Sequence, residues 1–150
     1  MKKMAILFLI GGSVLLYAAQ IQWVPYTQAL EQTKKEPRLI WAFLQASWCI
    51  PCRVMEREAF TDSGVIELLN TRFYPVRLDV ESKEIITCDG KKKTVERCFF
   101  DVWELNGTPS MVLIAPKGLS ILTLSQALSA KDLSFLLNRF LENEKEWLQP

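Results

Sequence analysis

Histidine is absent from this 150-residue chain, and cysteine occurs only four times. Without histidine the protein cannot form a Ser–His or Cys–His catalytic pair, an HExxH zinc site or an imidazole general base. Any chemistry must therefore use thiols, carboxylates or the backbone. A charge excess is also lacking, because 18 basic residues oppose 17 acidic ones and leave a formal net charge of +1. This balance gives no reason to expect nucleic acid as a partner.

The length and composition are those of a folded globular protein. Hydrophobic residues make up 49% of the chain and charged residues 23%, which is ordinary for such proteins. A chain of this length has room for one domain with one core. Internal repeats, low-complexity stretches and Gly/Ser linkers are all missing, so we expect a single domain that starts near residue 22.

The first nineteen residues differ from the rest. Lys2 and Lys3 precede an apolar stretch from Met4 to Ala19, which is the layout of a secretory signal. The stretch is short for a membrane span, which needs roughly 20 residues, but its end fits a cleavage site poorly. Residues 1–19 are therefore predicted to be a signal peptide or an N-terminal membrane anchor. Either one would export the remainder, in a bacterium to the periplasm, where disulfides form.

Hydrophobic patterning predicts alternating strands and helices in the exported part. Apolar or alternating runs indicate strands over residues 39–44, 73–80, 111–115 and 119–124. Helical spacing indicates helices over residues 26–35, 50–60, 63–71, 94–105 (the weakest) and 129–141 (the clearest). The first two strands are far enough apart for a parallel crossover, whereas the short turn at 116–118 makes the last two antiparallel. The predicted fold class is α/β, with a mixed central sheet flanked by helices on both faces.

Cys49 and Cys52 lie where the first predicted strand gives way to a helix. Two cysteines at this spacing can close a small disulfide ring. The helix N-terminus stabilises a thiolate on the first cysteine, and a thiolate is the nucleophile of disulfide exchange. The second cysteine, deeper in the helix, can resolve a mixed disulfide. Pro51 is tolerated in the first turn, where its missing N–H has no helical partner.

Two other interpretations of the pair stay open. A CxxC can form half of a zinc site, completed here by Cys88 and Cys98. It can also be an inert structural disulfide. The zinc alternative is less favoured because zinc knuckles sit on tight turns between short strands, and because Cys88 and Cys98 are nine residues apart internally.

Around this pair the chain resembles the thioredoxin superfamily. The run Trp48-Cys49-Ile50-Pro51-Cys52 matches the WCxPC motif of that family, and Gly107-Thr108-Pro109 looks like its cis-proline loop. The resemblance covers residues 22–147 and is greatest to exported, Dsb-type thiol–disulfide oxidoreductases. It implies a thioredoxin fold over those residues, preceded by the signal or anchor segment.

The resemblance also implies roles for individual residues. Cys49 would attack a substrate disulfide and Cys52 would resolve the resulting mixed disulfide. Trp48 would shield the site, Thr108 would offer its backbone to an extended substrate strand, and Pro109 would be cis and pack against the cysteines. The residues implied to support the site are Trp48, Ile50, Pro51, Thr108 and Pro109.

The function that follows is a periplasmic oxidoreductase acting on disulfides in exported proteins. Pro51 resembles the reducing members, whereas Thr108 also occurs among isomerases, so reduction is favoured over isomerisation or oxidation. No bound cofactor and no metal is expected beyond the cysteine pair itself. Electrons would come from a membrane or soluble partner protein, and the chain would touch a membrane only through an uncleaved N-terminal segment. A different class, a Cys-only zinc module or metal chaperone, stays open as the rival.

The chain departs from the family at one position of the first strand. Phe43 stands where the family commonly has a buried acid that serves the second thiol. Glu56 and Glu58 lie on the following helix, where we expect them to be solvated. Arg77 matches a position that is often lysine in the family, although it can equally be a surface partner of Asp79. The group that moves the proton of the second thiol is therefore left open.

Cys88 and Cys98 flank a turn with three lysines, Lys91-Lys92-Lys93. The surrounding segment, residues 82–97, looks like an insertion relative to a minimal thioredoxin, and its lysines read as a solvated hairpin or loop. A structural disulfide is the simplest interpretation of the two cysteines, worth roughly 2–3 kcal/mol by chain entropy. A second redox pair and two free thiols are the alternatives.

Overall fold

The structure is a computed structural model that describes residues 19–148. The predicted signal or anchor segment therefore lies outside the described residues, apart from Ala19. Within the described part of the chain, no helix is both long and apolar enough to cross a bilayer.

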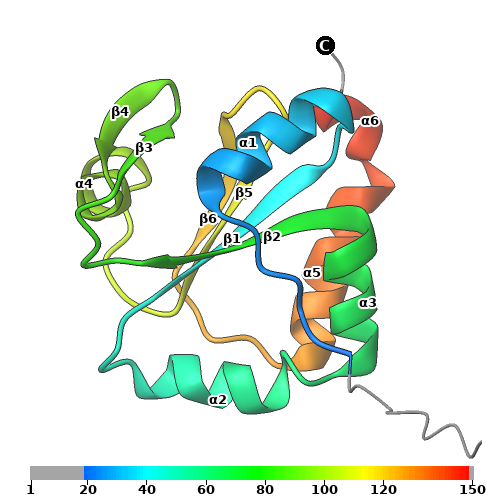
Figure 1. Cartoon of the computed structure of the whole chain (residues 1–150). Helices are drawn as coiled ribbons and strands as arrows, with labels where there is room; N and C mark the ends of the chain where they lie inside the picture. Colours follow the sequence, from blue (N-terminus) through cyan, green and yellow to red (C-terminus); the bar gives the residue numbers. More distant parts are fainter. Residues whose placement is uncertain (1–18, 149–150) are drawn as a thin grey trace, which may run out of the picture.

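The chain forms a mixed sheet, a separate hairpin and several helices (Figure 1). The strands are β1 (Leu39–Gln45), β2 (Phe73–Asp79), β3 (Ile85–Cys88), β4 (Lys91–Thr94), β5 (Ser110–Ile114) and β6 (Ser120–Leu124). The helices are α1 (Tyr26–Lys35), α2 (Ile50–Glu58), α3 (Ser63–Arg72), α4 (Val95–Arg97), the π-helical turn η1 (Cys98–Val102), α5 (Ala130–Glu142) and α6 (Glu144–Trp147).

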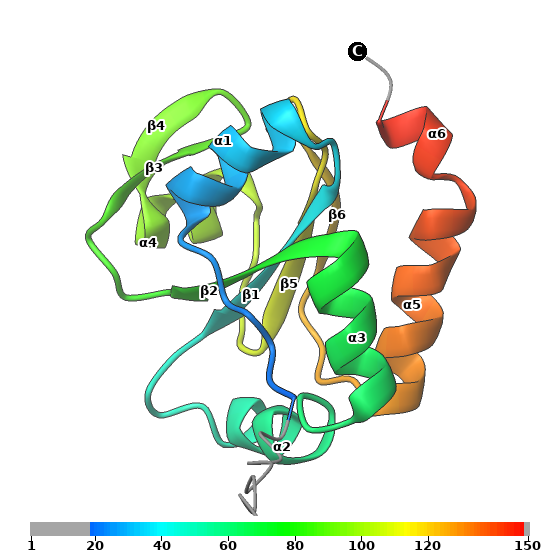
Figure 2. The same ribbon diagram turned by 45° about the vertical axis from the view of Figure 1, so that its right-hand side comes forward.

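The main sheet has the strand order β2-β1-β5-β6. β1 is parallel to β2 and antiparallel to β5, and β5 is antiparallel to β6. Figure 2 shows α1 and the β3–β4 hairpin on one side of this sheet, α3 and α5 on the other, and α2 across one end. The predicted mixed sheet with helices on both faces is confirmed.

β1 is the centre of the core because helices cover both of its faces. Six of its residues, Leu39–Leu44, are buried, as the continuous apolar run predicts for such a strand. β2 lies at an edge of the sheet, where a proline is tolerated. There the N–H of Val24 donates a hydrogen bond to the carbonyl oxygen of Pro75 at 2.8 Å, so the extended segment before α1 partly covers the edge.

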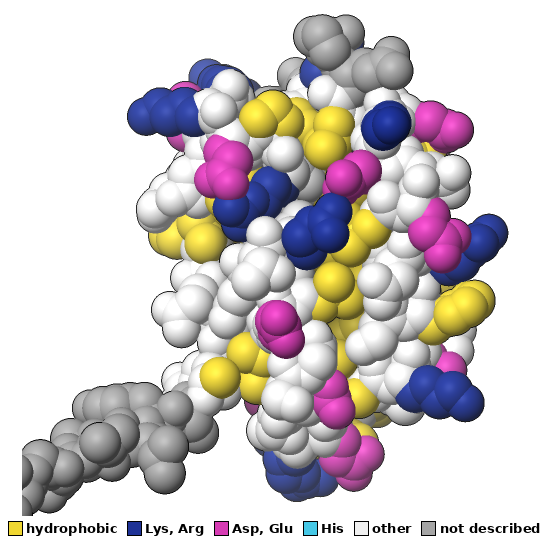
Figure 3. Space-filling model, turned by 90° about the vertical axis from the view of Figure 1, so that its right-hand side faces the viewer, with side chains coloured by type: hydrophobic (Ala, Val, Ile, Leu, Met, Phe, Trp, Pro, Cys, Tyr) yellow, Lys and Arg dark blue, Asp and Glu magenta, His cyan; other side chains and the backbone are white. Residues whose placement is uncertain are grey.

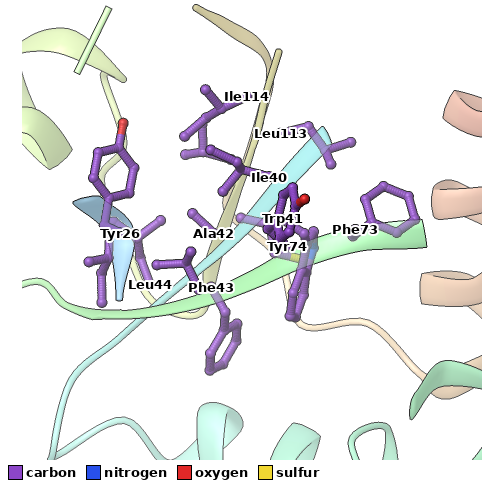
Figure 4. Packing of buried hydrophobic residues seen from close by; sticks show 14 of the residues in the cluster. Tyr26, Ile40, Trp41, Ala42, Phe43, Leu44, Phe73, Tyr74, Leu113 and Ile114 are labelled. Carbon is purple, nitrogen blue, oxygen red and sulfur yellow. The ribbon is translucent and has the colours of Figure 1, made fainter. Parts of the chain in front are cut away.

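Figure 4 shows how the largest core side chains project from β1. Trp41 and Phe43 are two residues apart, so they lie on the same face of the sheet, and their rings stack with centroids 5.9 Å apart. Phe60, just beyond α2, meets both edge-on, at 5.6 Å and 4.9 Å. The aromatic contacts therefore attach the C-terminal end of α2 to the sheet.

Two predicted helix starts are confirmed by their caps. The Asp62 carboxylate accepts a hydrogen bond from the Val65 N–H at 3.0 Å at the start of α3. The Ser129 hydroxyl accepts one from the Asp132 N–H at 3.1 Å at the start of α5. Each bond satisfies a backbone donor that the first turn of a helix leaves without an internal partner.

The helix predicted over residues 94–105 is wrong in its length and type. Only α4 is α-helical there, and the chain then widens into η1. The Trp103 N–H donates to the Cys98 carbonyl at 2.9 Å, which is the five-residue spacing of a π-turn. Glu104 follows with a φ of 52°, and this left-handed backbone ends the helix.

β3 and β4 form a hairpin that is fixed to the rest of the molecule. A disulfide joins Cys88, at the end of β3, to Cys98, at the start of η1. The Tyr26 hydroxyl donates to the Thr87 carbonyl at 2.8 Å. Burial, and to a smaller extent the charge of Asp89, raises the pKa of Tyr26, so its donor proton is retained. The Asp89 carboxylate in turn accepts hydrogen bonds from the backbone and side chain of Ser120.

The face formed by α3, α5 and α6 carries interspersed acidic and basic side chains (Figure 3). Hydrophobic atoms appear between them in a narrow vertical band. The ion pair between Arg72 of α3 and Glu144 of α6, at 2.9 Å, belongs to this region. On this face the charges therefore form no patch of a single sign.

We predict that the Cys88–Cys98 disulfide stabilises the fold. The double substitution Cys88→Ala/Cys98→Ala should lower the free energy of unfolding by about 2–3 kcal/mol, because it releases a loop closed across ten positions. Urea denaturation of the oxidised proteins measures the difference. An unchanged midpoint would show that the hydrogen bonds of Tyr26 and Asp89 hold the hairpin without the disulfide.

Candidate active site

Cys49 occupies the junction between β1 and α2. It is the N-cap of α2, in extended conformation, and its Sγ accepts a hydrogen bond from the Cys52 N–H at 3.2 Å. This N–H is one of the donors that have no partner inside the helix. A sulfur at such a position lies at the positive end of the helix dipole, which favours a thiolate over a thiol. The structure thus places Cys49 where the sequence predicts the attacking thiol.

Cys49 and Cys52 are joined by a disulfide, with their Cα atoms 5.3 Å apart. Both cysteines are buried, whereas the two neighbouring apolar side chains are exposed: 60% of Trp48 and 66% of Ile50 is accessible to solvent. Pro51 is exposed as well and lies in the first turn of α2. The disulfide is therefore bordered by apolar surface that a partner chain can contact.

The strand pairing brings the second predicted motif to the same end of the sheet. Leu44, near the end of β1, pairs with Ser110, at the start of β5. The chain continues from β1 into the cysteine motif, and it enters β5 from Thr108 and Pro109. The peptide bond between Thr108 and Pro109 is cis, and Pro109 is buried. The cysteine motif and the Thr108–Pro109 loop, about sixty positions apart in the sequence, therefore lie at the same end of two adjacent strands.

Ser110 is a site-forming residue that the sequence analysis missed. It is fully buried, and its hydroxyl forms hydrogen bonds with the Gly107 carbonyl and with the Ser125 hydroxyl, the latter at 2.7 Å. These bonds hold the loop before Pro109 against the chain that leaves β6. The sequence did contain a clue to this role, because Ser110 begins an otherwise apolar strand and a buried hydroxyl needs hydrogen-bond partners.

Thr108 carries a buried hydroxyl oxygen with no hydrogen-bond partner among the described residues. A buried polar atom without a partner is costly in a folded protein. Its backbone groups and its hydroxyl both belong to the loop that precedes the buried Pro109. The loop therefore retains hydrogen-bonding capacity beside the cysteine motif.

Phe43 lies inside an aromatic cluster formed by Trp23, Trp41, Phe43 and Phe60. It is completely buried, and its ring centroid is 4.9 Å from that of Phe60. An ionised carboxylate at this position would lie among apolar rings, and its cross-strand neighbour Arg77 is already paired with Glu56, so its charge would be unfavourable there. The local packing is therefore built for an aromatic side chain rather than for the acid common in the family.

Arg77 is not a partner of Asp79, so that predicted alternative is wrong. Its Nη1 lies 3.3 Å from Glu56 Oε1, and its guanidinium lies over the Trp23 ring, 4.4 Å from the centroid. The two side chains have different partners. Arg77 contacts Glu56 and Trp23, whereas the Asp79 carboxylate accepts a hydrogen bond from the Glu81 N–H at 2.8 Å.

Glu56 is correspondingly less solvated than the sequence predicts. Only 33% of its side chain is exposed, while Glu58 is exposed as expected. Glu56 and Arg77 line a cleft of about 510 Å³ together with Trp23, Phe60 and Thr61. This acidic and basic pair was missed because it depends on how α2 packs against β2, which residue spacing alone does not reveal.

The cysteines are present as two separate disulfides, Cys49–Cys52 and Cys88–Cys98. Over residues 19–148, no three Cys, Asp or Glu side chains lie close enough together to hold a metal ion. The structure therefore does not assemble the four-cysteine zinc site that the sequence left open.

Comparison with known proteins agrees with this arrangement. The profile of the thioredoxin-like domain family matches residues 26–141. The chain is 26% identical over 102 residues to the disulfide bond reductase DsbH of Chlamydia pneumoniae, a match that covers 67% of this chain and 60% of that protein. The chain thus spans less than two thirds of the length of this relative.

Solved structures share the fold. A thioredoxin from Thermus thermophilus superimposes with a TM-score of 0.64 at 22% identity, covering 81% of this chain and 88% of the thioredoxin. A DsbH oxidoreductase superimposes with a TM-score of 0.58 at 19% identity, covering 87% and 86% of the two chains. The chain therefore belongs to the thioredoxin-like domain family, and within the matched residues its CxxC motif forms the Cys49–Cys52 disulfide.

Proposed function

We propose that the protein is an exported thiol–disulfide oxidoreductase that reduces disulfides in other proteins. The observation that carries the proposal is the position of Cys49, whose sulfur caps α2 and is bonded to Cys52. We assign the thioredoxin-like domain to residues 22–147 and a signal or anchor to residues 1–19. Periplasmic location is supported by the Lys2–Ala19 pattern and by the similarity to DsbH.

In the reductive direction, the Cys49 thiolate attacks one sulfur of a substrate disulfide. The substrate S–S bond breaks, a Cys49–substrate disulfide forms, and the first substrate sulfur leaves as a thiolate. The Cys52 thiolate then attacks Cys49 Sγ. The Cys49–Cys52 disulfide forms, the second substrate sulfur leaves, and two electrons have passed from the protein to the substrate.

The surrounding residues have supporting roles in this proposal. Trp48 and Ile50 are exposed beside the disulfide and offer apolar contact to the substrate. The backbone and the unpartnered hydroxyl of Thr108 hydrogen-bond an extended substrate segment, and the buried Pro109 forms the floor beside the cysteines. Pro51 supports the reductive direction by its resemblance to reducing members of the family.

An electron donor is required to return the Cys49–Cys52 disulfide to the dithiol. The chain needs no bound cofactor for the exchange itself, so the donor is another dithiol protein, in the membrane or soluble. Isomerisation and net oxidation use the same two sulfurs as reduction. The three activities differ in how stable the Cys49–Cys52 disulfide is relative to the dithiol. The redox potential therefore separates these alternatives.

Replacing the attacking sulfur should abolish activity. We expect Cys49→Ser to reduce insulin disulfides, with dithiothreitol as electron donor, no faster than dithiothreitol alone. The Cys88→Ala/Cys98→Ala variant is the control and should keep its activity, because those sulfurs are buried away from the site. Activity retained by Cys49→Ser would refute the assignment, and loss of activity in a control that circular dichroism shows to be folded would make the second pair a redox pair.

Removing the resolving sulfur should trap substrates. We expect Cys52→Ala to accumulate Cys49-linked mixed disulfides in the periplasm, visible as bands that disappear on reduction. Cys49→Ala should trap none, since Cys52 lies inside the first turn of α2, past the N-cap position that stabilises a thiolate. Equal trapping by both variants would contradict the division of roles.

The direction can be measured by equilibrating the Cys49–Cys52 pair with glutathione buffers. A reductase should have a potential near or below about −230 mV, whereas an oxidase would lie near about −120 mV. Alkylation followed by mass spectrometry reads the dithiol fraction. An intermediate potential together with reactivation of scrambled ribonuclease would favour the isomerase alternative instead.

A further inference from the structure

The resolving cysteine needs a proton acceptor, and the core does not hold one. Cys52 must lose its proton before its sulfur can attack Cys49. Among residues 19–148, no aspartate or glutamate is buried, and the buried polar side chains are Thr33 and Ser110. Phe43 fills the position from which an acid would reach the site. Any carboxylate that serves Cys52 must therefore approach from the partly exposed side of α2.

Glu56 is placed to do this. It follows Cys52 by four residues within α2, so the two side chains lie on one face of the helix with Cβ atoms about 5–6 Å apart. Its side chain is 33% exposed, so solvent can reach it, whereas Cys52 on the same helix face is buried. Glu58 follows Cys52 by six residues, lies on another face of α2 and is exposed.

Arg77 and Trp23 hold this carboxylate at the site. Arg77 Nη1 lies 3.3 Å from Glu56 Oε1, and the guanidinium is stacked on Trp23. Arg77 is the charged group that β2 directs at Glu56, and Asp79 lies exposed two residues further along that strand. The extended segment 19–24, which borders the same cleft, carries no charged side chain. The carboxylate is thus fixed from one side and open to water on the other.

We propose that Glu56 exchanges the proton of Cys52, in place of the acid whose position Phe43 occupies, and that Arg77 is its positioning residue. The inference rests on the proposed function. During resolution, the Glu56 carboxylate takes the Cys52 proton directly or through one water, and the thiolate attacks Cys49 Sγ. In the reverse direction, the Glu56 carboxylic acid returns the proton to Cys52 as the disulfide opens.

The test isolates the second step of the exchange. Reduced protein is mixed with oxidised glutathione, quenched with acid at intervals, and analysed by mass spectrometry between pH 5.5 and 9. We expect Glu56→Gln to form the Cys49–glutathione disulfide at the wild-type rate. At pH 6 it should resolve this disulfide about 100-fold more slowly, the low end of general-base effects. The difference should shrink towards pH 9, where a thiol with an ordinary pKa of about 8.5 ionises in water.

Glu58→Gln is the matched control, with the same change on the same helix, and should resolve the mixed disulfide at the wild-type rate. Glu56→Asp keeps the acid on a shorter stem and should restore part of the loss. Arg77→Met should slow the same step without changing mixed-disulfide formation. Wild-type resolution by Glu56→Gln across the pH range, or equal slowing by Glu58→Gln, would overturn the inference.

These results are separable from failure of the proposed function. If Cys49 is not the nucleophile, no glutathione adduct forms on it in any variant, and Cys49→Ser keeps its activity. If only the present inference is wrong, the adduct forms and resolves in Glu56→Gln as in the wild type, while Cys49→Ser is inactive.

Discussion

The antiparallel pairing of β1 with β5 is the constraint on which the site depends. β1 delivers Cys49 to the start of α2, and β5 begins directly after Pro109, so the register of Leu44 against Ser110 sets how the two motifs meet. A slip of one residue would turn every side chain of β5 to the opposite face. The buried strands prevent such a slip, because all the residues of β5 and six of β1 lie in the core.

The aromatic cluster on one face of β1 determines where α2 can lie and which chemistry the core can hold. Phe60 packs edge-on against Trp41 and Phe43, and this fixes the end of α2 remote from Cys49. A cluster of this kind excludes water, and the cation beside it, Arg77, is already paired with Glu56, so burial would favour the neutral form of an acid at position 43. The same contacts that orient the active-site helix therefore move any proton acceptor out of the core, to the side of α2 that faces solvent.

Features that depend on residues close together in the sequence could be predicted, whereas features that depend on contacts between distant elements could not. The start of α5 was predictable because Ser129 and Asp132 are three residues apart and form hydrogen bonds with each other. β1 was predictable because a six-residue apolar run is typical of a strand buried on both faces. The thioredoxin-like fold followed from two motifs that stand in short, specific runs of residues. The π-turn at Cys98 was not predictable, since it depends on the left-handed backbone of Glu104 and on a disulfide to a distant strand. The Glu56–Arg77 pair was missed for the same reason, because its partners belong to a helix and a strand that meet only in the folded chain.

The partial exposure of Glu56 has a consequence that a sealed acid would not have. A carboxylate buried beneath a disulfide must return its proton through the protein, whereas Glu56 borders a cleft that is open to water. Exposed ion pairs contribute little to stability, typically below about 1 kcal/mol, so the Glu56–Arg77 pair is poorly explained as a structural brace. The stacking of Arg77 on Trp23 restricts the guanidinium, and through it the carboxylate that it contacts. A fixed and hydrated carboxylate one helical turn from a buried thiol can exchange protons with the solvent between successive reactions. The aromatic residue at position 43 is then compatible with thiol chemistry, because the acid and the core no longer compete for the same space.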